Sequence, residues 1–176
     1  MKFKSIFLIA LFLFFISFMG CIQTDKINGK QIGKGLKSVL PKPDKILIYS
    51  NGNTKELDKD SSEYKKVVQL TEKRFHDKLS TAKDIIEDST MNDIRKDGLG
   101  IEFLYDNEQE LSIKGNGFQP FKYYKLYFQL TSKKAGNSQG SMVHTLQYGD
   151  KEHYKDCSRG PLKYSEELVR LVEGLR

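Results

Sequence analysis

The sequence predicts an α+β domain with an antiparallel sheet of about five or six strands and two helices packed on one face of the sheet. Three observations lead to this class. Several short β-branched or aromatic segments are joined by turn residues, two segments carry apolar residues at helical spacing, and the strand-like segments are segregated from the helix-like ones. Strands joined by short turns pair antiparallel, because a parallel pair needs a long crossover connection.

The first predicted element is a β-hairpin. Residues 45–49 form a compact run of β-branched and aromatic side chains, and Asn51-Gly52-Asn53 is a strong turn signal. The chain then returns through residues 54–57. We therefore expect two short strands joined by a tight turn.

A helix is predicted over Ser62 to Lys78, where the spacing of the apolar residues changes from strand-like to helical. Either Ser61 or Ser62 can cap its first turn, and Glu63 lies near the positive end of the helix dipole. Its apolar face consists of Tyr64, Val67, Val68, Thr71, Phe75 and Leu79. The secondary structure of residues 80–97 stays open, because few of these residues are apolar.

A second hairpin is predicted from residue 101 to residue 113. Apolar residues dominate 101–105, Asp106-Asn107 is a turn signal, and Leu111 and Ile113 bring the chain back. Two further strands are expected over residues 123–130 and 142–148, with the polar loop 131–141 between them. A final helix is expected behind Ser165, which can cap it. Its first turn carries Glu166 and Glu167, and its apolar face is formed by Leu168, Val169, Leu171, Val172 and Leu175.

The predicted strand 123–130 offers a candidate binding surface. Successive side chains of a strand point to opposite faces, so a row that faces the helices alternates with a row that faces outward. The more apolar row is Tyr124, Leu126, Phe128 and Leu130, and the outward row is then Tyr123, Lys125, Tyr127 and Gln129. Tyrosine is enriched at interfaces, so Tyr123, Lys125 and Tyr127 are the predicted binding residues. Ordinary cross-strand packing of these rings is the alternative interpretation.

The charge distribution disfavours nucleic acid as a partner. The formal net charge is +6, but Lys2 and Lys4 precede an apolar run, and five further lysines lie between residues 22 and 43. Residues 44–176 hold 22 basic and 22 acidic side chains. The predicted domain is therefore neutral and lacks the concentrated basic surface that nucleic-acid recognition needs.

The N-terminal segment has the order of a bacterial signal peptide. Lys2 and Lys4 form a short positive region, residues 6–18 form an apolar run, and Gly20-Cys21 is followed at once by polar chain. The run is shorter than the roughly 20 apolar residues that a membrane-spanning helix needs.

The junction Phe18-Met19-Gly20-Cys21 resembles the lipobox of bacterial lipoproteins that are cleaved by signal peptidase II. In that family an apolar residue, a small or aliphatic residue and Gly or Ala precede an invariant Cys. The chain is similar in this respect to small, uncharacterised lipoproteins of Gram-positive bacteria. The resemblance implies that residues 1–20 are removed, that Cys21 carries a diacylglycerol and often a further palmitate, and that the protein is anchored on the outer face of the cell membrane.

Three regions are therefore expected. Residues 1–20 are the signal peptide, and residues 21–43 are the lipidated Cys21 and a flexible tether rich in Lys and Gly. Residues 44–176 form a single globular domain, which is all that a chain of this length allows.

Several short matches to catalytic or metal-binding patterns fail in their context. Gly136 to Gly140 match the nucleophile elbow G-x-S-x-G, but a polar segment rather than an apolar strand precedes them. Ser62 to Lys65 and Ser80 to Lys83 match S-x-x-K without the motifs that accompany it in penicillin-binding enzymes. The segment that begins at Asp58 lacks the glycine and the glutamate of a calcium loop. We therefore expect neither a metal site nor a cofactor.

Two hypotheses for the function remain open. The first is a membrane-anchored, non-enzymatic binding or interaction module of the cell envelope, whose partner is an envelope protein or a cell-wall ligand. The alternative is a small envelope enzyme that uses the polar segment 149–161, read as a loop between the last strand and the last helix. Its candidate catalytic residues are His153, Cys157 and Arg159, since a thiol near His and Arg can be activated as a nucleophile.

Overall fold

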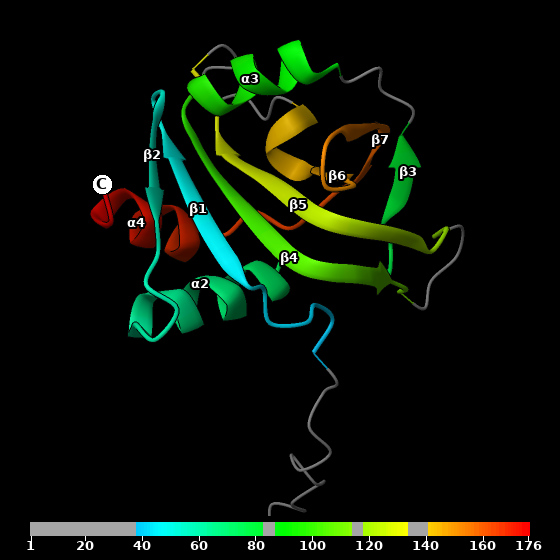
Figure 1. Cartoon of the computed structure of the whole chain (residues 1–176), viewed down its shortest axis with the longest axis horizontal. Helices are drawn as coiled ribbons and strands as arrows, with labels where there is room; N and C mark the ends of the chain where they lie inside the picture. The colour runs from blue at the N-terminus through cyan, green and yellow to red at the C-terminus, as the bar shows by residue number, and fades with distance from the viewer. Residues whose placement is uncertain (1–37, 83–86, 114–117, 134–140) are drawn as a thin grey trace, which may run out of the picture. The chain divides into compact units, whose positions relative to one another are not determined.

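The computed structural model describes residues 38–82, 87–113, 118–133 and 141–176 (Figure 1). In this part of the chain, seven strands form one antiparallel sheet in the order β2-β1-β4-β5-β6-β7-β3. The strands are β1 (Lys45–Ser50), β2 (Asn53–Glu56), β3 (Ser80–Ala82), β4 (Leu99–Leu111), β5 (Phe121–Thr131), β6 (Leu146–Gly149) and β7 (Tyr154–Gly160). The helices are α2 (Ser62–Glu72), α3 (Asp88–Lys96), α4 (Glu166–Gly174) and the 3₁₀ helix η1 (Ser141–His144).

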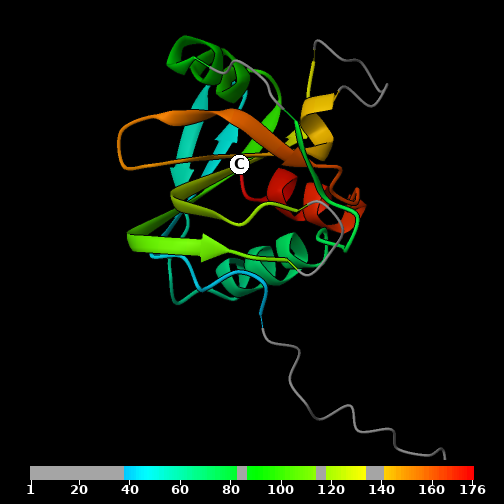
Figure 2. The same cartoon turned by 90° about the vertical axis from the view of Figure 1, so that its right-hand side faces the viewer.

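This architecture confirms the predicted α+β class and the antiparallel sheet, but it corrects the predicted five or six strands, the predicted two helices and their placement on one face. The described residues contain seven strands and three α-helices, and the helices cover both faces of the sheet. Helices α2 and α4 pack together over the larger core, whereas α3 contacts β1 and β4 from the other side. Figure 2 shows α3 above the strands and α2 below them. Residues 80–97, which the sequence left open, supply both β3 and α3.

Strand β5 shows why helices are needed on both faces. Leu126 and Phe128 lie in the core covered by α2 and α4, whereas Tyr127 packs with Met91 of α3 on the opposite face. Every residue from Lys125 to Leu130 is buried. A central strand that is covered on both sides has no outward row of side chains.

The predicted first hairpin is confirmed. Asn51 and Gly52 have positive φ angles of 51° and 89°, as a two-residue turn with φ above zero at both positions requires. β1 and β2 pair from Ser50 and Asn53 outward. β2 is one of the two edge strands of the sheet, and all four of its residues are exposed.

Helix α2 begins as predicted but ends six residues early. Ser61 is the N-cap, and its hydroxyl accepts a hydrogen bond of 3.1 Å from the backbone N–H of Tyr64. The helix ends at Glu72 rather than Lys78, and the chain turns there so that the side chain of Arg74 is buried. The guanidinium of Arg74 donates to the carbonyls of Lys163 and Val143, so it ties three segments of the chain together.

The expected turn at Asp106-Asn107 is wrong. β4 continues through both residues as one strand of 13 residues, and its pairing with β5 shifts between Leu104 and Gln109. The polar residues at this point therefore mark an irregularity in a long strand rather than its end. The return strand that was expected at Leu111 and Ile113 does not form, since Leu111 is the last residue of β4.

The C-terminal part combines one confirmed element with two corrections. Ser165 caps α4 as predicted and accepts a 3.3 Å hydrogen bond from the N–H of Leu168. Within the expected strand 142–148, the first residues form η1 and only the last form β6. The expected loop 149–161 contains β7, which pairs with β6 on one side and with β3 on the other.

The domain begins before the predicted boundary at Asp44. Leu40 is only 1% exposed and belongs to the larger core, and its backbone N–H donates to the Glu72 carboxylate at 3.0 Å. The hydroxyl of Tyr105 donates to the carbonyl of Pro41 at 3.2 Å, and that of Tyr64 donates to the carbonyl of Pro43. Residues 38–43 are thus part of the folded domain and not of the tether.

Candidate binding site beside helix α3

A polar cluster lies between α3 and the sheet, and Glu102 of β4 is at its centre. Glu102 alternates with Ile101 and Phe103 of the larger core, so its side chain points to the α3 face. It is only 3% exposed. Its carboxylate pairs with the guanidinium of Arg95 at 2.7 Å and accepts hydrogen bonds from the hydroxyls of Tyr49 and Tyr154. We call these four residues the Glu102 cluster.

The Glu102 cluster fixes Arg95 in position. Its guanidinium carbon lies 5.3 Å from the ring centroid of Tyr49 and 5.2 Å from that of Tyr154, so it contacts two aromatic rings. It also donates to the side-chain oxygen of Asn92, one turn earlier on α3, at 3.3 Å. Two rings, a carboxylate and an amide therefore hold one cation, and α3 is fastened to the sheet through it.

The phenols of the cluster remain protonated donors over the whole physiological range. Burial, followed by the charge of Glu102, raises the pKa of both Tyr49 and Tyr154 above its ordinary value. Lys125 lies beside them, with its ammonium 4.8 Å from the ring centroid of Tyr154. Burial lowers the pKa of Lys125, and the charge of Glu102 opposes this effect.

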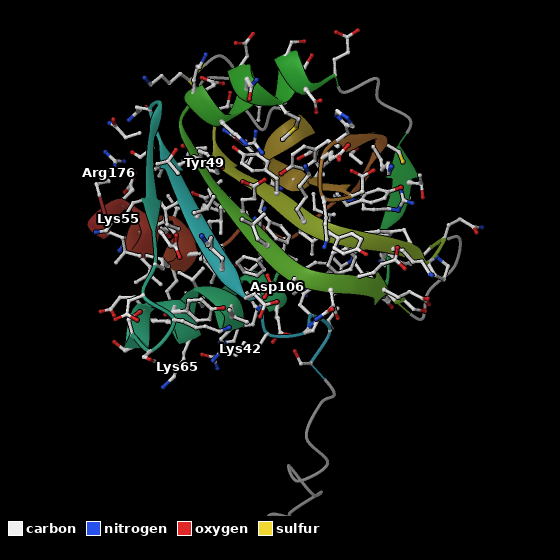
Figure 3. All side chains as sticks on the ribbon, viewed as in Figure 1. Lys42, Tyr49, Lys55, Lys65, Asp106 and Arg176 are labelled. Atoms are coloured by element: carbon white, nitrogen blue, oxygen red, sulfur yellow. The ribbon has the colours of Figure 1, made fainter. Side chains whose placement is uncertain are left out.

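A shallow groove of about 280 Å³ opens at one end of the Glu102 cluster. α3 contributes Asn92, Arg95 and Lys96 to its lining, and the β1–β2 hairpin contributes Tyr49, Gly52 and Thr54. This lining contains two cations, an aromatic ring, an amide and a hydroxyl but no carboxylate. We call it the α3 groove. Figure 3 shows Tyr49 at the end of β1 that lies near α3.

The three residues predicted to bind a partner do not form an exposed row. Tyr127 is fully buried on the α3 face, where its hydroxyl donates to Gln129 and the absence of a side chain at Gly100 leaves room for its ring. Tyr123 is buried in the larger core, with its ring centroid 5.3 Å from that of Tyr105. Lys125 is buried as well and donates to the backbone carbonyl of Glu152. The predicted outward surface therefore does not exist, and we do not retain these residues as a binding site.

The structure separates the candidate catalytic residues His153 and Cys157. His153 is exposed in the turn before β7, and its ring pairs with the carboxylate of Asp88 at 2.6 Å. Asp88 raises the pKa of this histidine, by its hydrogen bond and by its charge. Cys157 lies within β7, and its sulfur contacts the hydroxyl of Tyr148 at 2.8 Å. Arg159 also contacts Tyr148, so it stays near the thiol while the histidine does not.

The shorter catalytic and metal patterns find no support in the described residues. Gly136 to Gly140 and Lys83 lie outside these residues. Asp58 accepts a hydrogen bond from the N–H of Asp60 and so shapes the turn before α2. Where the structure is described, no group of three or more His, Cys, Asp or Glu side chains is placed to hold a metal ion.

The Glu102 cluster was not predicted from the sequence. Glu102 occupies a position that an exposed residue of a strand would also occupy, and Arg95 lies in the segment whose structure was left open. The relevant signal was the position of a glutamate between two strongly apolar residues of a central strand. Such a glutamate can be buried only if a cation and hydrogen-bond donors reach its carboxylate. Finding that cation requires knowing that α3 covers this face.

No protein family, no curated protein and no solved structure matches the chain. Among the described residues, no helix is long and apolar enough to cross a membrane.

Proposed function

We propose that the protein is a lipoprotein anchored through Cys21 on the outer face of the cell membrane, and that its domain is a non-catalytic binding module of the cell envelope. The anchor rests on the sequence alone, because residues 1–37 lie outside the described part of the chain. The positive N-terminus, the apolar run and the Gly20-Cys21 junction together resemble a lipoprotein signal segment. Two acyl chains on Cys21 would hold the domain at the membrane almost permanently.

The observation that carries the binding role is the lining of the α3 groove. A site for a small polar ligand needs a few well-placed polar groups on a rigid support. The Glu102 cluster supplies that support, because it holds Tyr49 and Arg95 in fixed positions at the groove. Lys96 follows Arg95 on α3 and is exposed, and its side-chain stem lies 4.0 Å from the position that a Cβ at Gly52 would take.

The charges favour an acidic ligand. The charge of Arg95 is balanced by Glu102, so Lys96 provides the cation that an incoming ligand meets, while Tyr49, Asn92 and Thr54 offer a ring face and hydrogen bonds. An acidic component of the cell wall, such as a polymer that carries phosphate or carboxylate groups, fits this combination.

The position of the groove agrees with such a partner. Residues 38–44 enter the domain at the start of β1, whereas the turn Asn51-Gly52 lies at the far end of that strand (Figure 1). The α3 groove is therefore at the end of β1 remote from residues 38–44, which do not line it and leave it open to a ligand.

The alternative enzyme hypothesis has less support. It requires His153 to activate Cys157, but the ring of His153 is engaged by Asp88 and the thiol contacts Tyr148. A general base must lie within hydrogen-bond reach of the group it deprotonates.

Binding can be tested by sedimentation with isolated Gram-positive cell walls. We expect the full protein to sediment with the walls at low salt, and we expect Lys96→Glu to weaken this binding at least about tenfold, since like charges placed against each other are strongly unfavourable. Lys65→Glu is the matched control, because Lys65 is exposed on α2, well away from Tyr49 and α3 (Figure 3). Equal binding by both variants, or no binding by the unchanged protein, would refute this site.

The anchor has its own test. We expect Cys21→Ser to abolish labelling of the protein with radioactive fatty acid and to leave the uncleaved precursor, because the peptidase acts only after lipid transfer. Fatty-acid labelling that survives this substitution would refute the lipoprotein assignment.

A further inference from the structure

A second group of side chains, outside the α3 groove, converges on one hydroxyl between β6 and β7. Cys157 and Arg159 are two residues apart on β7 and so project to the same face of the sheet. The sulfur of Cys157 lies 2.8 Å from the hydroxyl oxygen of Tyr148 on β6. A guanidinium nitrogen of Arg159 lies 3.4 Å from the same oxygen. The thiol and the cation are therefore bridged by one phenol.

Arg159 is a buried cation for which the described side chains provide no acidic partner. It is only 4% exposed, and none of the described carboxylate side chains forms an ion pair with it. Its guanidinium carbon lies 4.8 Å from the ring centroid of Phe121 and 5.0 Å from that of Tyr148. One of its nitrogens donates to the backbone carbonyl of Ser158, and its Nε has no hydrogen-bond partner. Buried charges are normally paired, so this positive charge is available to a negative group that forms nearby.

The hydroxyl of Tyr148 links Arg159 to the sulfur of Cys157 through hydrogen bonds. When the Tyr148 oxygen accepts from Arg159, its own proton is free to donate to Cys157, and a chain of hydrogen bonds of this kind strengthens each member. Burial and the hydrogen bond to Cys157 both raise the pKa of Tyr148, which keeps the phenol protonated and able to donate. Negative charge on the sulfur is thus stabilised by a donor at hydrogen-bond distance and by a cation behind it.

We propose that Cys157 is a site of reversible oxidation by small hydroperoxides, with Tyr148 and Arg159 as positioning residues. The thiolate, which is the reactive form of cysteine, attacks one oxygen of the peroxide. A sulfur–oxygen bond forms and the oxygen–oxygen bond breaks, so the sulfur is oxidised to a sulfenic acid. The departing oxygen is reduced, takes up a proton from solvent and leaves as water when the peroxide is H₂O₂. A thiol can later reduce the sulfenic acid through a disulfide.

The exposure of the thiol fits this substrate class. Cys157 is half-buried and packs against the larger core. H₂O₂ is among the smallest oxidants and needs little room to reach a sulfur in such a position. This site is independent of the proposed binding function, since none of its residues lines the α3 groove.

The test measures the rate of sulfenic acid formation. The full protein is treated with H₂O₂ in the presence of dimedone, and the adduct at Cys157 is quantified by peptide mass spectrometry. The same protein unfolded in urea gives the rate of a cysteine without neighbours. We expect the folded protein to react at least about tenfold faster than the unfolded chain, and Tyr148→Phe to remove most of this difference, as expected for the loss of one hydrogen bond to a charged group.

Two further variants make the result decisive. Tyr124→Phe changes a tyrosine of β5 whose ring centroid lies 5.0 Å from the ammonium of Lys151, and this variant should react as the unchanged protein does. Arg159→Gln removes the charge and should slow the reaction as Tyr148→Phe does, and circular dichroism checks that each variant is folded. If Arg159→Gln fails to fold, Tyr148→Phe decides alone. A folded protein that reacts no faster than the unfolded chain, or a Tyr148→Phe variant as fast as the unchanged protein, would overturn the proposal.

Discussion

Replacing Glu102 by alanine should destabilise the domain more than any surface change of the same kind. The substitution leaves the hydroxyls of Tyr49 and Tyr154 without their acceptor and leaves the guanidinium of Arg95 without its counter-ion. Removing one partner of a buried ion pair costs about 3–5 kcal/mol, because the other charge stays buried and uncompensated. The side chain of Arg95 is 22% exposed, so water can solvate part of it and the loss should lie at the lower end of that range.

Chemical denaturation in urea, followed by circular dichroism, measures this loss directly. Glu108→Ala is the matched control, because Glu108 lies on the same strand and pairs with Lys122 at the surface, where a salt bridge is worth at most about 1 kcal/mol. The double variant Arg95→Met with Glu102→Leu should recover part of the lost stability, since it removes both charges. The single variants Arg95→Met and Glu102→Leu complete the comparison. If Glu102→Ala costs less than about 1 kcal/mol, or if the effects of Arg95→Met and Glu102→Leu simply add in the double variant, then the Glu102 cluster does not fasten α3 to the sheet.

Three further predictions follow from the burial and the pKa values. Leu40→Ala should lower the free energy of unfolding by about 2–5 kcal/mol in urea denaturation, as expected for a buried leucine. Val39→Ala, at a residue that is 38% exposed, should change it little. Equal effects of the two variants would show that the domain begins at Asp44, as predicted from the sequence. Tyr127→Ala should cost about 3–5 kcal/mol in the same assay, and an unchanged free energy of unfolding would contradict the burial of this ring. The ring of His153 should titrate in NMR above its ordinary pKa of 6.5, and Asp88→Asn should bring the midpoint down. Because the folded-state pKa of His153 is raised, its ion pair stabilises the fold at pH values below the unfolded pKa, and this contribution is lost as the pH rises through the folded pKa. A titration midpoint of His153 that does not respond to Asp88→Asn would show that the ion pair is not formed in solution.

The elements that could be predicted from the sequence are those whose signals are local. The turn at Asn51-Gly52 needs two residues that tolerate positive φ, and the caps at Ser61 and Ser165 need only a hydroxyl before a helix. Such signals act within four residues and do not depend on what packs above them. They placed the first hairpin, the start of α2 and the whole of α4 correctly.

The errors arose where tertiary contacts overrule local preference. Asp106-Asn107 favours a turn, but pairing with β5 on both sides of these residues keeps β4 extended. The polar residues of β7 resemble a loop, yet β7 lies between β6 and β3, where strand pairing satisfies its backbone. The rule that alternate side chains face outward failed for Tyr127 because it assumes one solvated face, and α3 removes that face.

The order of the strands has a consequence for how fast the chain can fold. β3 joins the edge of the sheet by pairing with β7, so that Ser80 lies opposite Gly160. β1 joins the central strands by pairing with β4, which follows it by about 50 residues in the chain. Pairings between residues so far apart in the chain close large loops before they gain any contact energy, and sheets of this kind fold in milliseconds to seconds rather than microseconds. During that interval the apolar strands β4 and β5 are exposed. A chain that folds at this rate would therefore gain from protection of these two strands while its sheet assembles.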